Sequence, residues 1–256
     1  MLLTISIRNR DICFGVFDGE KLLNNYKIKS DVYKSPEEIY VLMKILIGED
    51  ISLKNVKNLI ISSVVPELTD TFKIIGNQYF KIKPIIIGAG VKTGINIKYE
   101  NPKELGSDRI VDAVAASVIY KGPAIVVSLG DIITFDVIGG KNDYLGGLIF
   151  PGIGLAKYAL ANFSAKLPQV EALKPQKLIG NSTVKAIQSG LYYSYVNLFD
   201  GNIKMLCKEL GLEPKDVKII VTGKYAEFLT DLSSYDLIIN DNLSLEGLRI
   251  LYEMNK

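Results

Sequence analysis

Apolar residues along the chain form short runs that are separated by polar turns. Residues 2–7 and 12–17 are two such runs of strand length with a first turn between them, and Asp18-Gly19 follows as a second turn. This order predicts that the chain opens as a hairpin meander. Further strands are predicted at 59–65 and 84–87, with helical patterns between them. Alternation of this kind is typical of an α/β sheet.

The middle of the chain repeats the opening pattern. A helix is predicted at 107–120, followed by a strand at 124–129, a turn at Gly130-Asp131 and a strand at 132–138. Two strand-turn-strand units of like design predict two similar α/β halves, residues 1–117 and 118–256, with a cleft between them. The remaining predictions are helices at 36–47, 153–163, 181–197, 200–210 and 244–253, and a strand at 217–222.

Composition narrows the class of protein. The chain has 256 residues, is 48% hydrophobic and carries a formal net charge of +2, so a sizeable core is expected without a polycationic surface for nucleic acid. Its longest apolar runs are of strand length, far below the roughly 18 residues that span a bilayer. No secretory signal is visible at the N-terminus. We therefore expect a cytoplasmic protein that binds neither membrane nor nucleic acid.

The sequence contains no histidine, which removes the commonest general base and the commonest transition-metal ligand. Acid-base chemistry would therefore fall to a carboxylate, a lysine or a tyrosine. Cys13 and Cys207 are far apart and form no CxxC motif, so both are expected to be buried thiols.

A set of motifs runs from one end of the chain to the other and resembles the type III pantothenate kinases. These enzymes phosphorylate pantothenate with ATP at the start of coenzyme A synthesis. The resemblance implies the two-domain fold of the actin-like ATPases, which include sugar kinases and Hsp70. The motifs are Phe17-Asp18-Gly19, Ile61-Ser62-Ser63-Val64-Val65-Pro66, Tyr99-Glu100-Asn101-Pro102, Gly106-Ser107-Asp108-Arg109-Ile110, Tyr144-Leu145-Gly146-Gly147, Pro151-Gly152-Ile153-Gly154 and Ala165-Lys166-Leu167-Pro168, with 180–190 and 243–252.

Members of this family resemble one another in three ATP-binding elements: an Asp-x-Gly-Asn-Thr loop, an Asp-Phe-Gly-Thr-x-x-Thr loop and a Thr-Gly-Gly turn. Glycine lets backbone N–H groups approach phosphate, and the aspartates hold the hydrated Mg²⁺. The family also uses a monovalent cation, K⁺ or NH₄⁺, near the second loop.

This chain departs from the family in all three elements. The first loop, residues 6–10, has Ser6 for Asp, Arg8 for Gly and Arg10 for Thr, and keeps Asn9. The second loop, residues 128–134, has Ser128 for Asp and Asp131 for Thr, and keeps Gly130 and Thr134. The third element reads Thr222-Gly223-Lys224. No ordinary MgATP site is expected, and no cofactor is expected in this chain alone.

The pantothenate side of the resemblance is intact. The residues that match the family's substrate motif are Tyr99, Asn101, Gly106, Asp108 and Arg109. The resemblance implies that Asp108 is the general base and that Arg109 holds the pantothenate carboxylate. Thr183 matches a threonine that reaches the neighbour's substrate in family dimers, so a dimer is implied. The structural alternatives are a helix start at Asp108-Arg109 and a turn built by Tyr99 and Asn101.

Arg8 and Arg10 allow three interpretations. They are solvated surface charges, or they form salt bridges with Asp11 or Asp131 that fill a lost nucleotide site, or they make a metal-free anion site. The second is favoured, because an arginine gained in one loop and an aspartate gained in the other have opposite charges and can form a salt bridge.

Three functional hypotheses follow from this partial loss. The first is the non-catalytic subunit of a heteromeric pantothenate kinase, paired with a paralogue that retains both aspartates. The second is a pantothenate or coenzyme A pathway sensor without catalysis. The third is an active kinase with a phosphate site rebuilt around Arg8 and Arg10.

Overall fold

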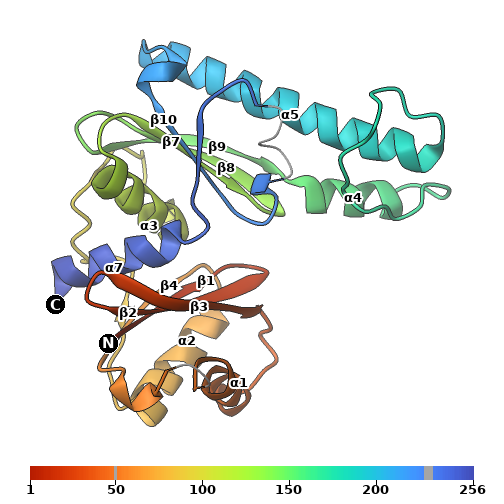
Figure 1. The fold of residues 1–256 in the computed structure, drawn as a ribbon. Coiled ribbons are helices and arrows are strands. Elements are labelled where there is room, and N and C mark those ends of the chain that lie inside the picture. Colours follow the sequence, from red (N-terminus) through yellow and green to blue (C-terminus); the bar gives the residue numbers. More distant parts are fainter. Residues whose placement is uncertain (49–50, 228–232) are drawn as a thin grey trace. The chain divides into compact units, whose positions relative to one another are not determined.

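The computed structural model describes residues 1–48, 51–227 and 233–256 (Figure 1). The chain folds into two compact units. Unit 1 comprises Met1–Gly94, Glu100–Ala115 and Asn242–Lys256, and unit 2 comprises Ile95–Tyr99 and Ala116–Asp241. These units differ from the expected halves 1–117 and 118–256 in three places, because residues 95–99 and 116–117 belong to unit 2 and the last fifteen residues belong to unit 1.

Unit 1 is built on a five-stranded sheet in the order β3-β2-β1-β4-β5. β1 is antiparallel to β2 and parallel to β4, with Ser6 opposite both Cys13 and Ser62. The opening meander is therefore confirmed. The strands are β1 (Leu2–Ile7), β2 (Asp11–Asp18), β3 (Lys21–Lys29), β4 (Asn58–Ser63) and β5 (Ile85–Ile86).

Helices cover this sheet, with α1 and α2 together on one face (Figure 1). α1 begins with a capping box, in which Ser35 Oγ accepts from the Glu38 amide and Glu38 accepts from the Ser35 amide. α7 crosses α3 closely enough that a Cβ at Gly247 would overlap the Val111 carbonyl, which ties the C-terminal helix to unit 1. The helices are α1 (Pro36–Gly48), α2 (Pro66–Ile75), α3 (Ser107–Ala115) and α7 (Leu243–Asn255), with short helical turns at Leu53–Asn55, Gly76–Phe80 and Pro102–Glu104.

Unit 2 repeats the hairpin in a six-stranded sheet of order β11-β10-β7-β8-β9-β6. β7 is antiparallel to β8 and parallel to β10, as β1 is to β2 and β4. β9 lies outside the predicted strands, because its glycines 146 and 147 obscure the alternation. The strands are β6 (Asn96–Ile97), β7 (Ala124–Leu129), β8 (Ile132–Ile138), β9 (Asp143–Pro151), β10 (Lys218–Thr222) and β11 (Leu237–Ile239).

The helices of unit 2 are α4 (Ile153–Asn162) and α5 (Thr183–Leu210), with turns at Ala116–Tyr120 and Pro214–Asp216. The prediction of separate helices at 181–197 and 200–210 was wrong, because α5 continues through Gly201. A glycine inside a helix costs only about 1 kcal/mol, and burial of Val196, Phe199 and Ile203 in the core offsets that cost.

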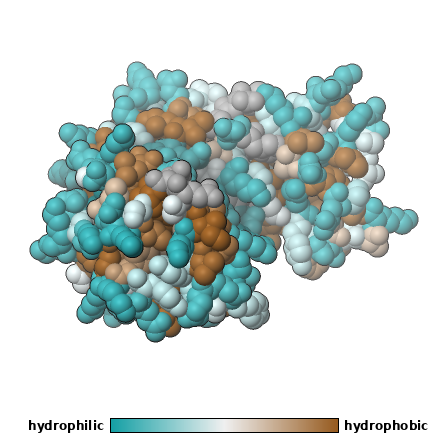
Figure 2. All heavy atoms as spheres, turned by 60° about the horizontal axis from the view of Figure 1, so that its bottom comes forward, coloured by the Kyte–Doolittle hydropathy of each residue, from teal (hydrophilic) through white to brown (hydrophobic). Residues whose placement is uncertain are grey.

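Part of the surface of unit 1 is apolar. Figure 2 shows apolar side chains gathered on the face that carries α1 and α2, where Val41, Ile45 and Ile74 are exposed. No helix in the part of the chain that the structure describes is long and apolar enough to cross a membrane.

Candidate functional site

The first loop joins β1 to β2 in unit 1. Ser6 lies within β1 and is 3% exposed, so an uncharged hydroxyl occupies the position that the family motif gives to aspartate. The turn is closed by the Arg8 amide, which donates to the Asp11 carbonyl at 2.9 Å. Asn9 and Arg10 lie at the exposed tip of the hairpin.

Arg8 is held by two groups that lie far away in the sequence. Its Nη2 lies 2.7 Å from Asp112 Oδ2 and 2.9 Å from Ser244 Oγ, and the Ser244 hydroxyl donates to Asp112 Oδ1 at 2.6 Å. The side chains of Arg8 and Asp112 are 28% and 4% exposed. Arg8 is therefore not the solvated surface charge of the first interpretation, and the sequence interpretation missed Asp112 as its partner.

In this triad (Arg8, Asp112 and Ser244), burial and charge pairing shift the pKa values in opposite directions. Burial lowers the pKa of Arg8, but Asp112 and then Asp108 outweigh it, and the pKa is raised. Burial raises the pKa of Asp112, and the charge of Arg8 and the Ser244 hydrogen bond offset only part of this rise. Both carboxylates therefore act on the guanidinium, but only Asp112 contacts it, and removing Asp112 would leave the partly buried charge of Arg8 short of its partner.

A sequence signal for Asp112 existed. It is the single charged residue of the segment 110–117, and it lies one helical turn after Asp108 on α3. Residues four apart on a helix share a face, so Asp112 and Asp108 point to the same side. A carboxylate in such an apolar stretch requires a partner.

The second loop, in unit 2, packs against the start of α4. The Asp131 carbonyl accepts from the Gly152 amide at 2.7 Å. A Cβ at Gly152 would overlap the Gly130 carbonyl, and one at Gly154 would overlap the Asp131 carboxylate. Gly152 is the N-cap of α4 and supplies no side-chain cap. The Asp131 carboxylate thus lies in the first turn of α4, where the helix dipole favours a negative charge. Gly152 and Gly154 therefore let the second loop pack closely against the start of α4.

The end of the second loop connects to a buried carboxylate. Thr134 Oγ1 donates to Asp136 Oδ2 at 3.0 Å, and the Tyr144 hydroxyl donates to Asp136 Oδ1 at 2.6 Å. Asp136 is 1% exposed, and the rings of Tyr144 and Tyr99 lie 6.1 Å apart. Thr134 and Tyr99, predicted for the nucleotide and the substrate, are therefore joined through two buried residues that sequence reasoning missed.

The third element folds back on the strand that leads into the second loop. Gly223 has φ 103°, and a Cβ there would lie 2.7 Å from the Leu129 carbonyl oxygen. Only glycine fits this position without strain. The Lys224 ammonium lies 5.4 Å from the centre of the Tyr225 ring.

The predicted substrate residues of unit 1 lie around the start of α3. Asp108 Oδ1 accepts from the Arg109 amide at 2.9 Å, and Arg109 is 7% exposed. A Cβ at Gly106 would lie 2.6 Å from Asp108 Oδ1, so glycine leaves room for the carboxylate. Asn101 caps the turn Pro102–Glu104, with its Oδ1 accepting from the Lys103 amide and its Nδ2 donating to Glu104. Asn101 thus has the turn-building role of the structural alternative, and the substrate roles stay predictions.

The predicted substrate residues are divided between the units. Tyr99 and Thr183 belong to unit 2, and the other four belong to unit 1. Thr183 is the first residue of α5 and is exposed, with Ser182 as the cap that accepts from the Lys185 amide.

The residues at the two predicted metal-side positions do not suit Mg²⁺. Ser6 and Ser128 are buried hydroxyls, whereas the ion prefers carboxylate oxygens beside its waters. Among the residues described, no three His, Cys, Asp or Glu side chains cluster in a way that could hold a metal.

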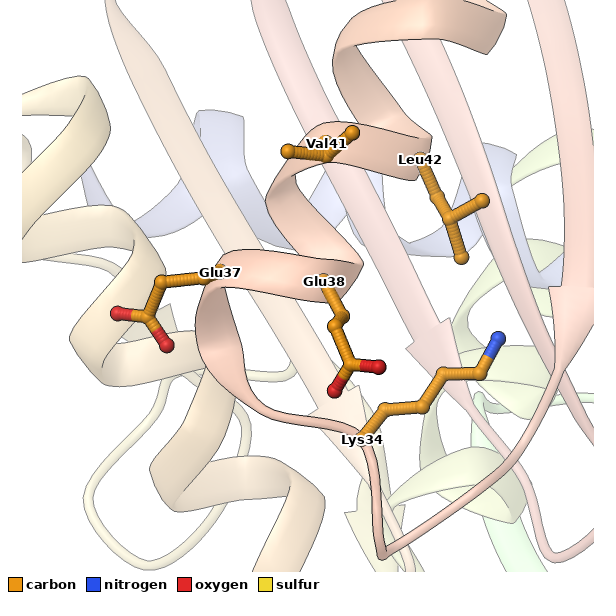
Figure 3. Close-up of a pocket in the computed structure, with 5 residues that line it drawn as sticks. All are labelled: Lys34, Glu37, Glu38, Val41 and Leu42. Atoms are coloured by element: carbon orange, nitrogen blue, oxygen red, sulfur yellow. The ribbon is translucent and has the colours of Figure 1, made fainter.

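A separate pocket of about 380 Å³ lies beside the first turns of α1 (Figure 3). Lys34, Glu37, Glu38, Val41 and Leu42 line it. None of these is a predicted site residue, so this pocket is not part of the candidate site.

Solved structures similar to this chain share its fold. A putative Baf family transcriptional activator from Campylobacter jejuni is 22% identical, with TM-score 0.58, over 99% of this chain and 98% of that one. A putative N-acetylmannosamine kinase from Listeria monocytogenes is 10% identical, with TM-score 0.52, over 98% of each chain. Sugar kinases among these structures, together with the two mixed sheets, show the two-unit actin-like ATPase fold.

Sequence comparison assigns the family. The family model of type III pantothenate kinase matches residues 2–205. Two proteins of Dehalococcoides mccartyi strains, each named type III pantothenate kinase, are 38% identical over all 256 residues and over 98% and 96% of their own lengths. The similarity therefore extends over the whole chain, and the protein belongs to the type III pantothenate kinase family of phosphotransferases.

Proposed function

We propose that this chain is the non-catalytic subunit of a heteromeric type III pantothenate kinase, which converts pantothenate to 4'-phosphopantothenate in coenzyme A synthesis. A catalytically intact paralogue would supply the ATP and Mg²⁺ site. The ion pair between Arg8 and Asp112 carries the proposal, because it puts a fixed, neutralised cation into the loop that the family uses for phosphate.

The same ion pair argues against a kinase rebuilt around arginine. A guanidinium attracts phosphate through its net charge, and Asp112 at 2.7 Å already neutralises the charge of Arg8. Asp131 adds a negative charge to the second loop. Arg8, one of the two arginines of that hypothesis, then offers no uncompensated positive charge to a metal-free phosphate site.

An assembly surface on unit 2 supports pairing with another subunit. α4, the segment after it and the start of α5 expose apolar side chains close to Thr183 in the sequence, and Phe163 and Ile179 are 89% and 85% exposed. Apolar side chains that gather into one exposed patch are typical of protein–protein contacts. The exposed apolar residues of this segment are Leu155, Tyr158, Leu160, Phe163, Leu173, Leu178, Ile179 and Val184.

The proposal is tested by co-expressing the chain with the family member of the same genome that retains both loop aspartates. We expect the two to co-elute, and we expect formation of phosphopantothenate to rise when this chain is present. Thr183→Ala in this chain should lower that activity, whereas Thr71→Ala, in which the lost hydroxyl bonds only the Glu67 carbonyl, should not.

Each other outcome contradicts the proposal in a different way. Failure to co-elute, or a genome with no intact second member, would overturn it. Tight pantothenate binding by the isolated chain, without any effect on a partner, would favour the sensor. Turnover by the chain alone, abolished by Arg8→Ala, would establish an active kinase.

A further inference from the structure

A second concave surface of unit 1 is lined by none of the predicted site residues. Its volume is about 560 Å³, within the range of small-molecule sites. It is bounded by α1, by the turn Leu53–Asn55 with residues 56–57 before β4, and by the end of the turn Gly76–Phe80 with the two residues after it. The residues that line this lysine pocket are Tyr40, Leu53, Lys54, Val56, Lys57, Tyr79, Phe80, Lys81 and Ile82.

The polar part of the lysine pocket is cationic. Lys54, Lys57 and Lys81 contribute three ammonium groups from two separate segments of the chain, and none of the described residues that line the pocket is acidic. All three side chains belong to exposed residues. A concave wall of low dielectric focuses the field of charges of one sign. The pocket therefore favours an anion.

The apolar part is a fixed aromatic wall. The rings of Tyr40 and Tyr79 are stacked with centroids 4.2 Å apart, and Phe80 meets Tyr40 edge-on at 5.8 Å. The Tyr79 hydroxyl donates to Glu37 Oε1 at 2.9 Å, which fixes the ring from outside the pocket lining. Rings held in this way offer contact area at little cost in conformational entropy.

Lys81 has a left-handed backbone conformation, with φ 58°, directly after the turn Gly76–Phe80. Lys121 has the same conformation, with φ 53°, directly after the corresponding turn Ala116–Tyr120 in unit 2. The left-handed conformation therefore occurs at the residue that ends each of these two helical turns. Glycine adopts it without strain, so a change to glycine removes the charge at either position without loss of stability.

We propose that the lysine pocket binds a small organic phosphate. The phosphate is held by Lys54, Lys57 and Lys81, and the apolar or aromatic part of the ligand lies against Tyr40 and Phe80. The proposal is independent of the function proposed above, because it uses no loop, substrate or interface residue of that function.

In the experiment, the full chain is titrated in a calorimeter with 1-naphthyl phosphate, and separately with inorganic phosphate and with 1-naphthol. We expect 1-naphthyl phosphate to bind one site per chain and to bind more tightly than either part alone. Affinity should fall as salt is raised, because exposed charges are screened.

Matched variants locate the site. Lys81→Gly should weaken binding of 1-naphthyl phosphate about three- to fivefold, the range of one exposed charge pair. Lys121→Gly should leave binding unchanged, and both variants should be at least as stable as the parent chain. Absence of saturable binding would overturn the proposal. Equal affinity of the Lys81→Gly and Lys121→Gly variants would overturn it as well, since the probe would then bind elsewhere.

Discussion

The first and second loops each join two antiparallel strands, and each carries a charge that the family motif lacks. These two charges are neutralised by different means. In unit 1 the charge of Arg8 is paired with a buried carboxylate from α3 and a serine from α7. In unit 2 the Asp131 carboxylate lies against the N-terminal turn of α4. An ion pair of this kind is costly to break, whereas a helix dipole contributes little. The first loop should therefore depend far more on its partner than the second.

The largest effect is expected for Asp112→Ala. It leaves the guanidinium of Arg8 partly buried without its carboxylate, and should lower the free energy of unfolding by about 3 kcal/mol in urea denaturation. Asp108→Ala, one turn earlier on α3, is the control and should cost under about 1 kcal/mol. Replacing Arg8 and Asp112 together by leucine should restore most of the stability. A double variant no more stable than Asp112→Ala would contradict the ion pair.

Gly152→Ala comes next. Its Cβ overlaps the Gly130 carbonyl, and a backbone clash of this kind should cost about 2 kcal/mol of unfolding free energy. Gly154→Ala differs, because its Cβ overlaps the Asp131 carboxylate, which is a side chain. Adding Asp131→Ala should therefore rescue Gly154→Ala and leave Gly152→Ala unrescued. Failure of Asp131→Ala to rescue Gly154→Ala would show that the Asp131 carboxylate does not lie in the first turn of α4.

Asp131→Asn should have a smaller effect. Loss of the negative charge at the start of α4 should cost about 0.5–1 kcal/mol at low ionic strength, and the cost should shrink in salt. The control is Asp236→Asn, because Asp236 is an exposed residue just before β11. A cost near that of Asp112→Ala would remove the contrast between the loops.

The smallest expected effect is on Cys13, which lies opposite Ser6. Burial raises the pKa of the Cys13 thiol, while Lys27 and Arg8 lower it. Arg8→Met should therefore raise this pKa further and slow alkylation of Cys13 by iodoacetamide at alkaline pH. Arg8→Lys keeps the positive charge and should change neither the pKa of Cys13 nor its rate of alkylation. Cys207 is the internal reference, because burial and then Glu213 raise its pKa.

Much of the architecture follows from local pattern. The opening meander, the repeated hairpin and the capped helix at Pro36 depend on apolar alternation and on capping residues that are adjacent in the sequence. β9 and the continuous α5 depart from the predictions, because glycines 146, 147 and 201 weaken the local signal. Tertiary packing decides such segments.

The candidate site was predictable only in part. The substitutions at Ser6, Arg8 and Ser128 are visible in the sequence, as is the intact segment that contains Asp108. The structure added partners, since Asp112 and Ser244 lie 104 and 236 residues from Arg8. It also added the buried pair Asp136 and Tyr144. The need of Asp112 for a partner is visible locally, but its pairing with Arg8 and Ser244 is not, because only packing brings residues at such separations together.

The sequence alone determined the family resemblance, the two repeated hairpins and the loss of both metal-side carboxylates, since each depends on which residues stand at fixed spacings. Tertiary structure decided what the new charges do. A charge in a folded protein interacts with the groups that packing places beside it. For Arg8 these groups include Asp112 and Ser244, and for Asp131 they include the start of α4. Electrostatic neutralisation acts over a few ångströms in space, whatever the separation along the chain.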